Sequence, residues 1–107
     1  MTSFQDRERA EEAKFAHDAD MAFRIQARRN RLLGQWAAER MSLSPAESEA
    51  YAKAVVQADF EESGDEDVIR KLLGDITSAG VEISEIEVRA ALDDKQVQAR
   101  RALLGEG

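Results

Sequence analysis

The sequence predicts an all-α protein, a small four-helix bundle with a mobile or partly helical segment at its N-terminus. Two aspects of composition and one of pattern support this. Ala, Glu, Lys, Leu and Arg make up 54 of the 107 residues, a composition typical of long helices and helical bundles. Apolar residues recur at helical spacing along most of the chain. Leu, Ile, Val and Phe number only 23, so the core is small and one segment is expected to lie outside it.

The first helix is expected to end near Met41. Its apolar positions recur at steps of three and four residues, which places them on one face of a helix. A glycine, Gly34, interrupts this stripe at a cost of about 1 kcal/mol relative to alanine, which suggests that another helix approaches closely there. The stripe consists of Ile25, Leu32, Leu33, Trp36, Ala37 and Met41.

The start of this helix determines the domain organisation. A helix over residues 4–41 would be about 57 Å long, whereas partner helices of up to 20 residues reach about 30 Å. About half of it would have no packing partner, and an isolated helix of about 15 residues is marginal in water. We therefore expect residues 1–18 to be mobile or only partly helical in the free protein, and residues 19–107 to form the bundle.

Three further helices are expected near residues 45–62, 66–79 and 85–104. The connections between them are short, two to five residues, so sequential helices are expected to run antiparallel. The last helix has the least regular pattern of the four. Its best apolar stripe is Ile86, Val88, Leu92, Ala99 and Leu103.

The helix boundaries follow from capping residues. Ser44 and Glu47 have the spacing of a capping box, and Ser84 and Glu87 repeat it. Asp65 is expected to be the N-cap of the helix between them. Glycines at positions 64, 80 and 105 stand where helix C-termini favour a left-handed residue.

Charge and composition exclude several classes of function. The net charge of −7 argues against nucleic-acid binding. The chain has no cysteine, which excludes disulfides and thiolate zinc sites. No apolar run approaches the roughly 18–20 residues that cross a bilayer, and no signal peptide follows the first residue. We expect a cytoplasmic protein without direct membrane insertion that is a monomer when free.

Two groups of residues are candidates for binding, and each has a simpler explanation. Arg24, Arg28 and Arg31 share one helix face and could contact a nucleotide or another small anion. Alternatively, this basic face pairs electrostatically with the acidic stretch near residues 61–67. Phe4 and Phe15 lie three helical turns apart and would share a face that binds an apolar groove. The alternative is a solvated helix end.

Neither a metal site nor a catalytic site is expected. His17 is the one histidine, and on a helix it would share a face with Asp20 alone, which is too few ligands for a closed metal site. The sequence has no glycine-rich phosphate loop and no nucleophile elbow. We therefore expect a protein that is not an enzyme and has no cofactor.

Six blocks of residues, spread over nearly the whole chain, share a pattern with one known family. They are Phe4–Ala10, Glu12–Asp18, Ala27–Gly34, Trp36–Ala38, Tyr51–Val56 and Asp59–Val68. The pattern resembles the alphaproteobacterial family that includes the zeta subunit of the F1-ATPase, whose members are small four-helix proteins. The N-terminal and arginine-rich blocks are the most specific.

This resemblance implies a regulatory subunit that inhibits ATP hydrolysis by F1, peripheral to the inner membrane through the F1 headpiece. The N-terminal segment would become helical in the cleft between the alpha, beta and gamma subunits and block rotation. Weak binding of ATP or ADP is also associated with the family, and some members have lost inhibitory potency. Carried over by position, the partner-binding residues are Phe4, Arg7, Glu8, Arg9, Glu11, Glu12, Lys14 and Phe15.

Overall fold

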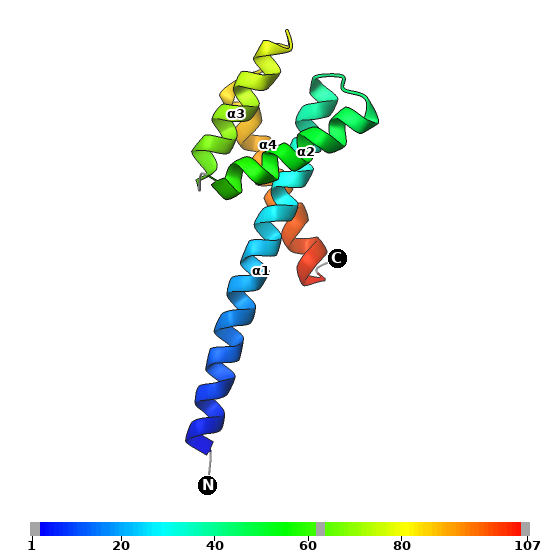
Figure 1. Ribbon diagram of the computed structural model, residues 1–107. Coiled ribbons are helices and arrows are strands. Elements are labelled where there is room, and N and C mark those ends of the chain that lie inside the picture. Colours follow the sequence, from blue (N-terminus) through cyan, green and yellow to red (C-terminus); the bar gives the residue numbers. More distant parts are fainter. Residues whose placement is uncertain (1–2, 62–63, 106–107) are drawn as a thin grey trace.

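The computed structural model describes the backbone of residues 3–61 and 64–105, and the side chains of residues 19–61 and 64–105. This part of the chain forms four helices and no strands (Figure 1). The all-α, four-helix prediction is confirmed, and the end of the first helix and both boundaries of the other three lie within about one residue of their expected positions. The helices are α1 (Ser3–Arg40), α2 (Pro45–Glu61), α3 (Asp65–Ser78) and α4 (Glu85–Leu104).

Helix α1 is the axis of the molecule. It contacts each of the other three helices, and its N-terminal half projects beyond them, which gives the protein extents of 67 × 29 × 26 Å (Figure 1). The first buried side chain along the described part of the chain is Ile25. Helix α1 runs from Ser3 without a break. The expected mobility of residues 1–18 concerns residues whose side chains lie outside the description.

The core is formed where the second half of α1 meets the other three helices. Figure 1 shows α2 crossing α1, while α4 begins beside α3 and then runs behind and alongside α1 to the C-terminus. Trp36 and Tyr51 are partly buried against this core, as expected of bundle anchors. The buried members of the core are Leu33, Ala37, Val55, Val68, Ile69, Leu72, Ile76, Val88, Ala91 and Leu92.

Local capping chemistry explains the boundaries of α2 and α4. The Ser44 backbone N–H donates to Glu47 Oε1 at 3.0 Å, and the Glu47 N–H donates to Ser44 Oγ at 3.2 Å. The hydrogen bond from the Ser44 backbone N–H, together with the Ser44 hydroxyl, lowers the pKa of the Glu47 carboxyl below its ordinary value. The Glu87 N–H likewise donates to Ser84 Oγ at 3.2 Å. Both predicted N-caps are confirmed.

Two local expectations are wrong. Asp65 is the first residue of α3 and not its cap; Gly64 occupies the N-cap without a side-chain hydrogen bond, and the Asp65 carboxylate forms an ion pair with Arg29 instead. Ile86 belongs to no core stripe, since 79% of its surface is exposed. Ala91, a smaller residue, is buried on α4 instead. Contact with α1 decides which face of α4 is buried, and the size of the side chains on each face does not.

Gly34 lies at the closest approach of α1 and α2, as its position in the apolar stripe suggests. A Cβ atom at this position would lie 2.7 Å from the Ala52 Cα atom. Gly74, within α3, has no atom within 4 Å of the corresponding position. Packing against α2 therefore requires a glycine at position 34, whereas nothing packed around position 74 does. The two positions form a matched pair for substitution.

We expect Gly34→Ala to destabilise the protein by about 1–2 kcal/mol, because overpacking against the α2 backbone outweighs the gain in helix propensity. Gly74→Ala is expected to stabilise it by up to about 1 kcal/mol, since only the propensity changes. Urea unfolding followed by circular dichroism measures both. Equal shifts in the two variants would show that the close approach at Gly34 has no energetic consequence.

Candidate functional site

The predicted partner-binding residues all lie on the first half of α1. Their backbone is part of the continuous helix that starts at Ser3, and their side chains lie outside the described residues. The eight residues are Phe4, Arg7, Glu8, Arg9, Glu11, Glu12, Lys14 and Phe15.

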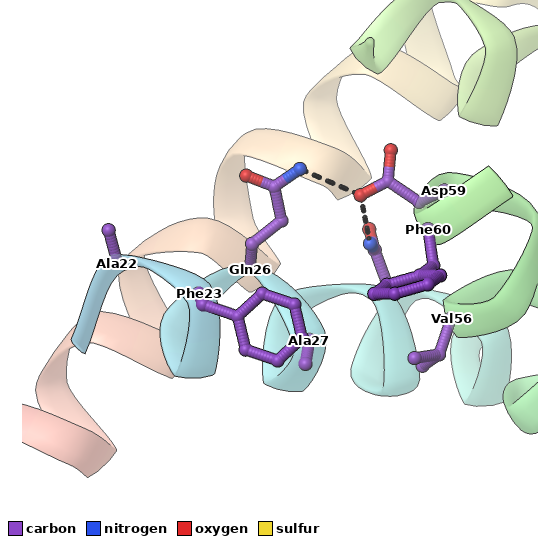
Figure 2. Close-up of a pocket in the computed structure, with 8 residues that line it drawn as sticks. Ala22, Phe23, Gln26, Ala27, Val56, Asp59 and Phe60 are labelled. Atoms are coloured by element: carbon purple, nitrogen blue, oxygen red, sulfur yellow. Dashed lines mark hydrogen bonds between the residues drawn. The ribbon is translucent and has the colours of Figure 1, made fainter. Parts of the chain in front are cut away.

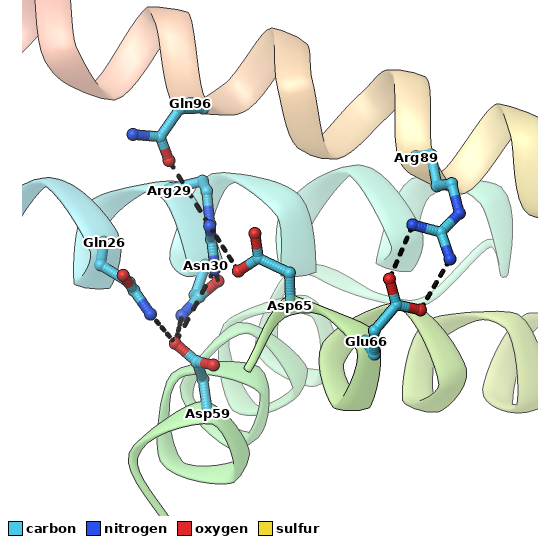
Figure 3. Close-up of polar contacts among 8 residues, drawn as sticks. All are labelled: Gln26, Arg29, Asn30, Asp59, Asp65, Glu66, Arg89 and Gln96. Atoms are coloured by element: carbon cyan, nitrogen blue, oxygen red, sulfur yellow. Dashed lines mark hydrogen bonds and ion pairs between the residues drawn. The ribbon is translucent and has the colours of Figure 1, made fainter. Parts of the chain in front are cut away.

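A buried polar cluster lies where this projecting helix enters the bundle (Figure 3). Its centre is Arg29, which is 3% exposed. The Arg29 guanidinium pairs with Asp65 Oδ1 at 3.0 Å and lies 3.8 Å from Asp59 Oδ2. It also donates to the Gln96 side-chain oxygen at 3.5 Å. One arginine on α1 thus joins residues from α2, α3 and α4.

Amide side chains complete this cluster. Asn30, 1% exposed, accepts a hydrogen bond from Arg29 Nη2 at 2.8 Å through Oδ1. Its Nδ2 group donates to Asp59 Oδ2 at 2.6 Å, and Gln26 Nε2 donates to the same oxygen at 2.7 Å. The other Asp59 oxygen, Oδ1, is buried without a hydrogen-bond partner among the described residues. Asp59 therefore depends on Arg29 for charge compensation.

Sequence reasoning did not single out Arg29, although a signal was present. Arg29 lies four residues after Ile25 and four before Leu33, and therefore on the apolar face of the helix. An arginine in that register must be paired when it is buried. Among the described residues, the arginine of α1 that pairs with the acidic stretch is therefore Arg29, through Asp65, and not one of the three that share the other face.

A second ion pair joins α3 to α4 at the surface. The Arg89 guanidinium donates to both carboxylate oxygens of Glu66, at 3.0 and 2.6 Å (Figure 3). It also pairs with Glu85 at 3.3 Å. The hydrogen bond from Arg89 lowers the pKa of Glu66 below its ordinary value, and the two carboxylates raise that of Arg89.

The three arginines proposed to contact anions are only partly brought together. Arg28 and Arg31 line a shallow groove of about 740 Å³ between α1 and α2, together with Lys53 from α2. Arg24 does not line this groove and pairs with Asp20 at 3.1 Å. The groove thus combines cationic groups from two helices with an apolar floor that includes Leu32 and Val56.

A further pocket of about 300 Å³ lies beside the buried cluster, between the N-terminal part of the packed region of α1 and the end of α2 (Figure 2). Its walls carry two exposed aromatic rings, Phe23 and Phe60, which meet edge to face with centroids 6.3 Å apart. Gln26, Asn30 and Asp59 supply its polar atoms. Sequence reasoning missed this pair, because Phe60 meets Phe23 only once α2 has crossed α1.

Within the described side chains, no group of three His, Cys, Asp or Glu residues could hold a metal ion. His17 lies outside them. None of the helices searched combines the length and apolarity that a membrane span requires.

Two comparisons with known proteins find similarity to this chain. A family model described as "ATPase inhibitor subunit zeta" matches residues 1–102. A solved structure, described as a solution NMR structure, is 46% identical to this chain and superimposes with a TM-score of 0.69. The match covers 81% of this chain and 99% of that one. No curated protein matches.

Proposed function

The chain belongs to the ATPase inhibitor subunit zeta family, and from this membership we propose that it is a non-enzymatic regulatory subunit that inhibits ATP hydrolysis by F1. Its partners are the alpha, beta and gamma subunits. The N-terminal segment inserts as a helix at their interface and blocks rotation. The protein is a monomer when free, and in the cytoplasm it associates with the inner membrane through the F1 headpiece.

The observation that carries this proposal is the length of α1 relative to the bundle. The helix has 38 residues, yet the first side chain that is buried in the described part of the chain is Ile25. A helix that projects beyond its own core gains stability from an external partner. The candidate contacts on residues 4–15 lie on this projecting part, and such a segment can order completely on binding.

The direct test is inhibition of purified cognate F1. We expect the full chain to lower the rate of ATP hydrolysis to near zero at saturation, as a rotation block requires, while free protein has no ATPase activity of its own. A coupled assay of ADP release measures the rate as a function of protein concentration. Hydrolysis that stays unchanged at saturating protein would contradict the proposal and would favour a family member that has lost inhibition.

The groove of Arg28, Arg31 and Lys53 supports a second candidate function, binding of ATP or ADP. Three cations around an apolar floor suit a phosphate chain attached to a base. Titration of the protein with ATP, followed by amide chemical shifts, tests it. Shifts confined to this groove, combined with no effect on F1, would favour a nucleotide-binding module over an inhibitor.

A further inference from the structure

The aromatic pair of Phe23 and Phe60 is exposed to a degree that the fold does not require. Phe23 is 58% exposed and Phe60 is 71% exposed, although their rings touch. Exposed apolar surface that is concentrated at one place marks an interaction site more often than chance. Figure 2 shows both rings among the residues that line the pocket, with the Gln26 amide and the Asp59 carboxylate beside them and joined by a hydrogen bond.

We propose that this pair and its pocket form a second docking surface for F1, which receives an apolar side chain of the F1 surface beside the mouth of the cleft. This proposal rests on the proposed function. The inhibitory segment supplies the block, and the aromatic pair holds the bundle against the outside of the enzyme.

The chemistry of the pocket favours an apolar occupant. Asp59 is the one charged residue that lines it. The Oδ2 atom of that carboxylate accepts hydrogen bonds from Gln26 and Asn30, and Arg29 compensates its charge. The other oxygen, Oδ1, has no hydrogen-bond partner among the described residues but is itself buried, so a cation in the pocket would not reach an exposed, unpaired carboxylate oxygen. An aliphatic or aromatic side chain would bury the faces of two phenylalanine rings, and aromatic residues are enriched at binding hot spots.

F1 is the partner that the position of the pocket favours, because the pocket lies on the same face of α1 as the predicted F1-binding positions. At 100° per residue, positions 4, 15, 19, 22 and 23 fall within about 100° of arc around a continuous helix. The face of α1 that lines the pocket therefore continues to the positions of Phe4 and Phe15. Alanines at positions 19 and 22 separate the aromatic positions and allow close approach.

The axial distance is also short. Position 23 lies eight residues after position 15, about 12 Å along the helix axis. A partner surface that encloses position 15 needs to extend only about 12 Å further along the helix axis to reach position 23. A single enzyme surface can therefore contact the inhibitory segment and the aromatic pair at the same time, and each contact raises the effective concentration of the other.

The test substitutes each phenylalanine in the full-length protein and measures both binding to purified cognate F1 and inhibition of its ATPase. Phe60→Ala and Phe23→Ala are each expected to raise the concentration for half-maximal inhibition about tenfold, with full inhibition still reached at saturation. Ile86→Ala is the control, because Ile86 is also a highly exposed apolar residue, on α4, and does not line the pocket. Thermal unfolding of each variant verifies the fold, and Phe60, the more exposed ring, keeps the test valid if Phe23→Ala loses stability.

The outcomes separate the two proposals. If the wild type inhibits and all three variants inhibit equally, the docking surface is refuted and the inhibitor function stands. If the wild type binds F1 without inhibiting it, and Phe60→Ala weakens that binding, the inhibitor function fails and the docking surface stands. Absence of binding refutes both. A concentration-dependent dimer that Phe60→Ala abolishes, with inhibition unchanged, would assign the pair to a second copy of this chain and overturn the proposal.

Discussion

A version of the protein that begins at residue 19 is expected to lose at least 100-fold in inhibitory potency toward cognate F1 while its bundle unfolds at nearly the same temperature. Two aromatic anchors in one segment, each contributing about 2 kcal/mol or more, account for a loss of that size. The bundle keeps its stability because the deleted part of α1 projects beyond the other three helices (Figure 1). The ATPase assay and differential scanning calorimetry measure the two quantities.

Phe15→Ala sharpens the same prediction within the full-length chain. It is expected to weaken inhibition by about 30-fold or more and to leave unfolding unchanged. His17→Ala is its control, because helical spacing places position 17 on a different face from positions 4 and 15. If the truncated version inhibits as well as the full chain, the block does not come from this segment, and a surface of the bundle must supply it.

The fold could be predicted from sequence because its signals are local. The capping box of Ser44 and Glu47 and the N-cap at Ser84 depend on residues three positions apart, and both are present in the structure. Asp65 shows the limit of such signals. It has the chemistry of an N-cap, but a buried arginine from another helix offers its carboxylate a stronger, charge-assisted partner.

The candidate site could be predicted only where it follows one helix. The spacing of Phe4 and Phe15 needs nothing beyond the period of α1. The pair of Phe23 and Phe60 and the cluster around Arg29 join residues that are 29 or more positions apart, so they depend on how α2 and α3 pack against α1. Sequence periodicity identifies which face of a helix is buried, but it does not determine which residue of another helix lies opposite.

Arg29→Met is expected to cause the largest loss of stability of any single substitution considered, about 3–5 kcal/mol. Methionine replaces the stem of the arginine in volume but removes the charge that compensates Asp59, whose side chain is only 5% exposed. Asp65 is half exposed and water can solvate it. At about 4 °C or more for each kcal/mol, the melting temperature should fall by at least about 12 °C. The loss is a large share of the total stability of such a domain, which is about 5–15 kcal/mol.

Two further variants test whether the unpaired charge of Asp59 is the cause. Arg89→Met removes an arginine that makes a bidentate pair at the surface, and it is expected to unfold at nearly the wild-type urea concentration because water replaces the pair. Adding Asp59→Asn to Arg29→Met should recover about 2 kcal/mol, since the amide oxygen still accepts from Gln26 and Asn30 and no buried charge remains. If the double variant is no more stable than Arg29→Met alone, lost packing around the guanidinium, and not the uncompensated carboxylate, explains the destabilisation.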